Sequence, residues 1–423
     1  MGSCQPRRPY AVRVATYPIR GLELKEHEFE VPLDHAHPDG EKITIFVREA
    51  ASPESAKAPP LLFLQGGPGH ESPRPTLANP PWLRRALKDF RVFFLDQRGT
   101  GRSAPIEAHD ASDPMTLGIR LTHFRADAIV EDAEFIRRDL GLDQWSLLGQ
   151  SFGGFVALCY LSRHPESIRE AMFAGGLPPI GHEIDQIYEA TFAAMARKSK
   201  AFFRRFPSAK ARLDRALQAC AAGEVILPSG ESLSTRRLLT IGHLLGFSAG
   251  EQIHYLLECA PTSASFAHDV AALLPFGGRN PLYAVLHESC YADGGVTGWA
   301  AERALDRLQE GADEITFTGE HLFRWHFDEE PGLRHFRDTA AVLADHDWPR
   351  LYDPEVLARC EVPCAASIYG DDPFVIREFS EETGRLIPTM RPWLTNEYEH
   401  GGLRASGDRV FDRLLNLVRD RVD

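Results

Sequence analysis

The stretch Trp145-Ser-Leu-Leu-Gly-Gln-Ser-Phe-Gly-Gly-Phe-Val-Ala-Leu-Cys-Tyr-Leu161 decides the fold of this chain. It opens with a short apolar run typical of a buried strand, turns at Gly149–Gly153, and continues with apolar residues at helical spacing. A serine in such a strand–turn–helix unit projects its hydroxyl above the sheet, and glycines two residues to either side let strand and helix approach closely. We therefore predict that Ser151 is a nucleophile rather than an incidental serine in a glycine-rich loop.

Length and composition restrict the class of protein. At 423 residues the chain exceeds a usual single domain, which predicts two domains or one core with a large insertion. A net charge of -13 argues against nucleic acid or an anionic membrane as a partner. Residues 1–9 lack the apolar core of a signal peptide, and no apolar run is long enough to span a bilayer. With seven scattered cysteines, which indicate reduced thiols, we expect a cytoplasmic protein.

Apolar runs alternate with helical patterns around the central stretch. This alternation predicts a mostly parallel, doubly wound α/β sheet covered on both faces by helices. Short alternating runs between residues 10 and 47 predict antiparallel strands at the edge of that sheet. We expect buried strands at 59–64, 91–95, 168–174 and 363–369, a last strand near 393–397, and helices at 125–139 and 409–418.

Between residues 181 and 350 the strand signals vanish and amphipathic helical patterns replace them. We predict a core formed by residues 1–180 and 351–423, with residues 181–350 inserted as a helical cap. The expected helices cover 187–204, 213–222, 235–245, 251–258 and 299–309.

A serine nucleophile needs a base, and the base needs a carboxylate to orient it. In hydrolases with this turn the chain order is serine, acid, histidine, each in a loop that follows a strand. Ser151, the pair Asp371-Asp372 and His400 occur in that order. We prefer Asp372 as the acid, because Asp371 directly follows the strand-ending Gly370 and is placed to cap the turn. Either aspartate could instead cap a helix that starts near residue 374.

A glycine-rich turn, Gln65-Gly-Gly-Pro-Gly69, follows the strand expected at 59–64. Such a turn exposes backbone N–H groups, so we predict an oxyanion hole formed by the amides of Gly67 and Phe152. After the strand at 91–95 we expect a structural loop braced by a pair between Asp96 and Arg98.

We expect no metal and no organic cofactor. His35 and His37 lie in a turn-rich loop where histidines are usually exposed, and Cys360 and Cys364 lack the second pair of a zinc site. His321 and His326 lack the glutamate spacing of a zinc peptidase and are expected to be residues of the cap.

Five motifs are spread over the predicted core: Gln65-Gly-Gly-Pro-Gly69, Asp96-Gln-Arg-Gly-Thr-Gly-Arg-Ser103, Gly149-Gln-Ser-Phe-Gly-Gly154, Tyr369-Gly-Asp-Asp372 and Glu399-His-Gly-Gly-Leu-Arg404. In their combination the chain resembles the proline iminopeptidase (prolyl aminopeptidase) family of α/β-hydrolases, in particular its longer bacterial form. Gln65 departs from the histidine common in that family, and Pro373-Phe374 also depart from its usual residues.

The resemblance implies release of an N-terminal residue, typically proline, from short peptides through an acyl-enzyme. It also implies that glutamates of the cap hold the free amino group and that aromatic residues pack on the pyrrolidine ring. The candidates here are Glu288 and Glu320, with Tyr291, Phe317 and Phe323 as pocket aromatics. Each glutamate could equally be a helix-surface charge, and each aromatic could equally be part of the packing of the cap.

Three other functions stay open from the sequence. An esterase or amidase would use the same triad with an apolar acyl pocket, and a tripeptidyl-type aminopeptidase would share the same turn. A non-catalytic receptor for a small molecule would need the pocket without turnover, which the order Ser151, Asp372, His400 argues against. A homo-oligomer is possible.

Overall fold

The structure is a computed structural model that describes residues 11–309 and 317–422. Its centre is a nine-stranded sheet with the order β1-β2-β3-β5-β4-β6-β7-β10-β11. The first three strands and β5 pair antiparallel, and all pairs from β5 to β11 are parallel. The bounds are β1 Ala11–Ile19, β2 Leu22–Pro32, β3 Lys42–Ala51, β4 Pro60–Leu64, β5 Arg91–Leu95, β6 Trp145–Gln150, β7 Ile168–Ala174, β10 Cys364–Tyr369 and β11 Met390–Thr395.

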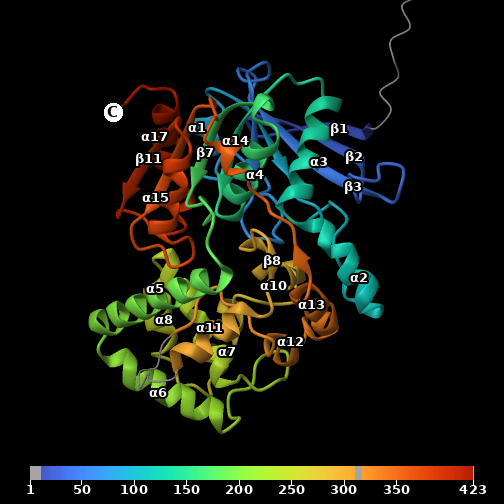
Figure 1. Ribbon diagram of the computed structural model, residues 1–423. Helices are drawn as coiled ribbons and strands as arrows, with labels where there is room; N and C mark the ends of the chain where they lie inside the picture. The colour runs from blue at the N-terminus through green and yellow to red at the C-terminus, as the bar shows by residue number, and fades with distance from the viewer. Residues whose placement is uncertain (1–10, 310–316, 423) are drawn as a thin grey trace, which may run out of the picture.

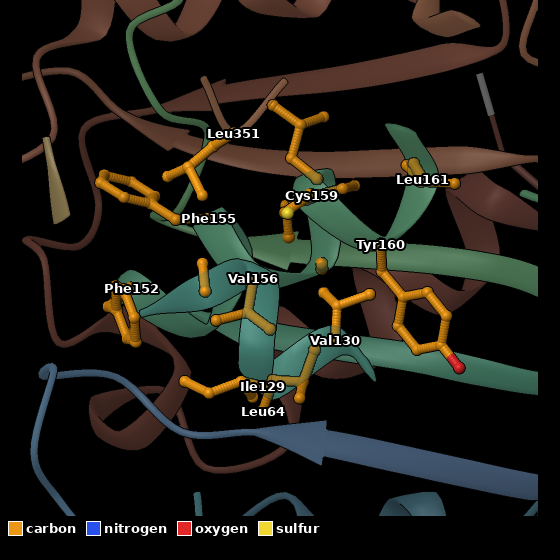
Figure 2. Packing of buried hydrophobic residues seen from close by; sticks show 14 of the residues in the cluster. Leu64, Ile129, Val130, Phe152, Phe155, Val156, Cys159, Tyr160, Leu161 and Leu351 are labelled. Carbon is orange, nitrogen blue, oxygen red and sulfur yellow. The ribbon is translucent and has the colours of Figure 1, made fainter. Parts of the chain in front are cut away.

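Both faces of the sheet are buried, as the continuous apolar strands predict. Successive residues of a strand point to opposite faces, and in β4 Leu62 and Leu64 join one apolar cluster while Leu61 and Phe63 join another. Helices α3 (Ala126–Asp139) and α4 (Phe152–Arg163) pack in the first cluster, where Figure 2 shows their side chains interleaving. Helices α1 (Leu83–Ala86) and α17 (Arg409–Val418) cover the opposite face. The predicted α/β class is therefore confirmed.

Between β7 and β10 the chain forms a helical layer, the region drawn from green to orange at one side of the sheet in Figure 1. A two-residue ribbon, β8 (Gly295–Val296) with β9 (Asp347–Trp348), is the one strand pair described there. The helices are α5 Ile184–Arg205, α6 Ser208–Ala221, α7 Thr235–Leu239, α8 Gly250–Leu256, α9 Ala264–Leu273, α10 Pro281–Val285, α11 Ala300–Gln309, α12 His326–Glu329 and α13 Arg337–Ala344, with a 3₁₀ helix η4 at Thr240–Phe247.

The helical layer also recruits a segment from the first half of the chain. Helix α2 (Pro114–Leu121) packs against α13, and Leu117 and Leu121 share an apolar cluster with Leu343 and Trp348. The layer is therefore joined to the sheet by more than the two chain crossings at its ends. Three short helices complete the second half of the core: α14 Pro354–Leu357, α15 Arg377–Leu386 and α16 Gly402–Ala405.

The loop after β5 is braced differently from our prediction. Asp96 is fully buried and pairs with Arg74 at 2.8 Å, while Arg98 pairs with Asp132 of α3 at 2.6 Å. The predicted pair between Asp96 and Arg98 is wrong because each side chain finds a partner from another segment. His35 also differs from expectation, since its ring is half-buried and lies 2.8 Å from Asp132.

Candidate active site

Ser151 occupies a strained turn between β6 and α4. Its φ of 54° and ψ of -127° lie outside the regions that residues with a side chain normally adopt. Hydrogen bonds hold the turn: the Ser151 amide donates to the Ala174 carbonyl at 3.1 Å, and the Gly154 amide donates to the Ser151 carbonyl at 2.7 Å. A Cβ at Gly153 would lie 1.9 Å from the Leu64 carbonyl oxygen, so only glycine lets α4 approach the sheet this closely. The turn therefore fixes the hydroxyl of Ser151 at the carboxyl edge of the sheet.

Ser151, His400 and Asp372 form a hydrogen-bonded chain. The Nε2 atom of His400 lies 2.8 Å from the Ser151 hydroxyl, and its Nδ1 atom lies 2.7 Å from Oδ2 of Asp372. In this arrangement Nδ1–H donates to the carboxylate, which leaves Nε2 free to accept the serine proton. The geometry is that of an acyl-transfer triad, built from three loops that each follow a strand.

Asp372 orients the histidine and also closes its own turn. Its Oδ1 atom accepts from the amides of Phe374 at 2.9 Å and Val375 at 3.1 Å, and the side chain is buried. Asp371 is exposed. Capping of the turn by Asp371 is thus a wrong prediction, because Asp372 serves that purpose with its second oxygen. The helix expected near residue 374 starts later, at Arg377.

The surroundings of His400 prepare it to act as a base. Burial alone would lower its pKa, but the adjacent carboxylate of Asp372 outweighs burial, and the pKa of His400 is raised above its ordinary 6.5. The rings of Phe247 and Phe374 stand edge-on to the imidazole, with centroids 5.7 Å and 5.2 Å away. A protonated His400 is therefore stabilised in the way that the transition state of acyl transfer requires.

The glycine turn after β4 lies directly against the nucleophile. A Cβ on Gly66 would come within 3.0 Å of the Ser151 Cβ and 2.8 Å of the Gln150 amide oxygen. Gly67 has a φ of 141°, a conformation that side chains disfavour, and Gln97 holds the Gln65 carbonyl through a 3.0 Å hydrogen bond. Phe152 is the first residue of α4, so its amide has no partner within the helix. The close contact with Ser151 is thus made by Gly66, and an oxyanion hole formed by the amides of Gly67 and Phe152 stays a prediction.

A cavity of about 610 Å³ opens onto Ser151 and His400. Its walls come from the glycine turn, from η4, from the segment around α9 and α10, and from the loop that contains Glu320. The side chains that matter for the argument below are His70, Phe247, Tyr283, Arg279, Glu320 and Arg404.

Glu320 is the predicted cap glutamate that lines this cavity. Its carboxylate accepts a hydrogen bond from the Tyr283 side chain, and its main-chain carbonyl accepts one from Nε2 of His287 at 2.6 Å. Burial raises the pKa of Glu320, against the opposing influence of His400. A carboxylate in such a site gains much from an added cation, because the cation relieves the cost of burying the negative charge.

The other predicted substrate-binding residues lie outside the lining of the cavity. One carboxylate oxygen of Glu288 accepts from the Ala301 amide at 2.9 Å, at the N-terminal end of α11. Tyr291 is buried between other aromatic rings and donates its hydroxyl to the Phe374 carbonyl at 3.2 Å. Phe317 and Phe323 are buried in apolar clusters. These four residues support the site through packing and hydrogen bonds.

Tyr283, Phe247 and Arg404 escaped prediction as site residues. Arg404 was part of a quoted motif without a role, and the two aromatics belong to no motif.

Within residues 11–309 and 317–422, no group of three or more His, Cys, Asp or Glu side chains is arranged to hold a metal ion. In the same residues no helix combines the length and the apolar character needed to cross a bilayer.

Comparison with known proteins agrees with the geometry. A family model described as the alpha/beta hydrolase fold matches residues 59–220. A proline iminopeptidase of Aeromonas sobria is 44% identical over 96% of this chain and 98% of its own length. One of Aspergillus aculeatus is 31% identical over 94% of each chain, and one of Neisseria meningitidis is 32% identical over 31% of this chain and 36% of its own. The chain belongs to the proline iminopeptidase family of α/β-hydrolases.

Proposed function

We propose that the chain is a serine aminopeptidase that releases N-terminal proline, or a similar small residue, from short peptides. The observation that carries this proposal is the carboxylate of Glu320 in the same cavity as the Ser151–His400 pair. A free α-amino group, charged at neutral pH, finds in Glu320 the counter-ion that a blocked N-terminus cannot use. The names of the relatives agree with this substrate.

The reaction follows from the positions of the three triad residues. The Ser151 oxygen attacks the carbonyl carbon of the first residue while His400 Nε2 takes the hydroxyl proton. The amides of Gly67 and Phe152 receive the oxyanion. Collapse of the tetrahedral intermediate breaks the peptide bond, and His400 returns its proton to the leaving amine. Water, deprotonated by His400, then hydrolyses the ester on Ser151 and releases the free amino acid.

The test is steady-state hydrolysis of proline-β-naphthylamide, its N-acetyl derivative and a simple acetate ester. We expect cleavage of the free amine alone, and a fall of about 10⁴-fold or more in Ser151→Ala. Glu320→Gln is expected to raise KM by about 10- to 100-fold, because the ammonium loses its charged partner. Glu288→Gln, a matched change outside the cavity, is expected to leave KM as it is.

Rapid cleavage of the acetylated substrate or the ester would contradict the anchoring of the amine. An esterase or amidase acting through the same triad would then be the better description.

We also propose a cytoplasmic location, which is supported by the six cysteines of the described residues, all of which are free thiols.

A further inference from the structure

The cavity contains a second charged group whose role the triad and Glu320 do not explain. Arg404 lies on α16, four residues after His400, and lines the cavity with Ser151. Its positive charge acts on three other groups that line the cavity. It favours the deprotonated forms of His70, Glu320 and His400 and so works to lower the pKa of each. The guanidinium therefore acts on the interior of the site although the residue is exposed to solvent.

In the part of the chain that the structure describes, the Arg404 side chain forms no ion pair with a carboxylate, although its charge acts on Glu320. The other arginine of the cavity, Arg279, is neutralised by an ion pair with Glu71. On the next helix, Arg409 pairs with Glu397 at 3.4 Å. The chain has 60 acidic residues against 47 basic ones, so an unpaired arginine inside a ligand cavity stands out.

Glu320 and Arg404 carry charges of opposite sign and line the same cavity as Ser151 and His400. Glu320 is largely buried and suits an ammonium, whereas Arg404 is exposed and suits an anion. A short peptide with both termini free carries one charge of each sign. If its amino end meets Glu320 and its first carbonyl meets Ser151, the rest of the peptide extends toward the open side of the site.

We propose that Arg404 binds the C-terminal carboxylate of a dipeptide or tripeptide substrate, and so selects for peptide length. The proposal rests on the proposed aminopeptidase function and adds the leaving-group side of the substrate to it. A guanidinium binds a carboxylate through two parallel N–H···O bonds, which a neutral amide cannot match. A cavity of about 610 Å³ is of the size that takes a small ligand.

The test compares Pro-Gly and Pro-Gly-Gly with their C-terminal amides, using proline-β-naphthylamide as a substrate without a carboxylate. For the wild type we expect kcat/KM to favour the free acid of at least one length by about 10-fold or more. In Arg404→Gln the ratio of acid to amide should fall to about one, and in Arg404→Lys it should be intermediate. Arg409→Gln, which removes the same charge from the neighbouring helix, should keep the wild-type ratio.

Each outcome separates this proposal from the proposed function. A wild type that cleaves proline-β-naphthylamide but treats acids and amides alike overturns the carboxylate site and leaves the aminopeptidase standing. Retention of the preference in folded Arg404→Gln overturns it as well. A wild type that cleaves none of the proline substrates refutes the proposed function, and the proposal about Arg404 falls with it. Should Arg404→Gln fail to fold, the wild-type ratio and Arg404→Lys still decide the matter.

Discussion

At the scale of single residues, Asp371 and Asp372 show how one step along the chain separates two functions. Asp372 is buried against His400, and Asp371 is exposed. Asp372→Asn keeps an oxygen for the Phe374 and Val375 amides but removes the charge that stabilises protonated His400. We expect kcat to fall by about 10⁴-fold in Asp372→Asn, and to change less than about twofold in Asp371→Asn. A larger fall of kcat in Asp371→Asn than in Asp372→Asn, measured by steady-state kinetics, would show that Asp371 is the acid of the triad.

Glu288 gives a second prediction, about stability. Burial raises its pKa from 4.5 to about 7, so the folded protein holds a proton that the unfolded chain releases. The stability from this proton is present below pH 4.5 and is lost as the pH rises toward about 7. Glu288→Gln keeps an acceptor for the Ala301 amide and abolishes that loss. We expect the variant to exceed the wild type by about 2 kcal/mol at pH 8.

Urea unfolding at pH 8 and pH 5 measures this difference, which should be smaller at the lower pH. Glu355 is the matched control, because its side chain is 87% exposed. Glu355→Gln should show no such pH-dependent gain. An equal gain at both pH values in Glu288→Gln would mean that the side chain acts by packing and not by ionisation.

The residues that could be predicted from the sequence are those whose role is indicated by a short local motif. Ser151 and His400 sit in short motifs bounded by glycine, and the chain order supplied the acid. Glu288 and Glu320 look alike in the sequence, and only tertiary packing decides that one caps α11 while the other faces the nucleophile. The aromatics Phe247 and Tyr283 reach the site from segments without any motif. Such a pocket is assembled by contacts between distant segments, which a single sequence does not record.

At the scale of elements, the contact between α4 and the sheet sets the position of the nucleophile. Gly153 allows the helix to touch β4, where the Leu64 carbonyl would clash with any Cβ. Gly153→Ala should therefore push α4 away from β4 and cost about 1–3 kcal/mol of stability. It should also lower kcat, because the proposed oxyanion donors, Phe152 on α4 and Gly67 after β4, would no longer align. Gly277→Ala, with no atom within 4 Å of the new Cβ, is the control for thermal unfolding and activity.

The elements themselves were largely predictable because their apolar patterns are strong. The observed bounds of β4, β5 and β7 agree within one residue with those predicted from their apolar runs. Strand β11 begins at Met390, ahead of the start expected near Trp393, because its alternating exposure gives a weaker apolar run. The contact of α2 with the helical layer had no local signal, since it depends on which distant helix packs there.

At the scale of the whole molecule, the helical layer is tied to the loop of the catalytic histidine. Lys198 of α5 pairs with Glu399 at 2.5 Å, and the amide of His400 donates to the Gly246 carbonyl of η4 at 2.9 Å. Both charged side chains are largely buried, so Lys198→Met leaves Glu399 without its counter-ion. We expect a loss of about 2 kcal/mol in stability together with a lower kcat.

The comparison for this prediction is Arg377→Met. Arg377 pairs with Glu381 on the surface, with 42% of its side chain exposed. Its replacement by Met should lower the free energy of unfolding by less than about 0.5 kcal/mol. Thermal unfolding of both variants at neutral pH makes the distinction. Equal effects would show that the pair between Lys198 and Glu399 is an ordinary surface interaction.

The ties between the His400 loop and the helical layer bear on how members of the family can be recombined. Exchange of residues 181–350 between two relatives is an obvious route to a new substrate range, because that segment supplies a large part of the pocket wall, including Phe247, Tyr283 and Glu320. Yet the carbonyl of Gly246 and the amine of Lys198 lie inside the exchanged piece, while His400 and Glu399 lie outside it. Chimeras should stay active only when residues 397–404 are inherited from the same parent as the helical layer.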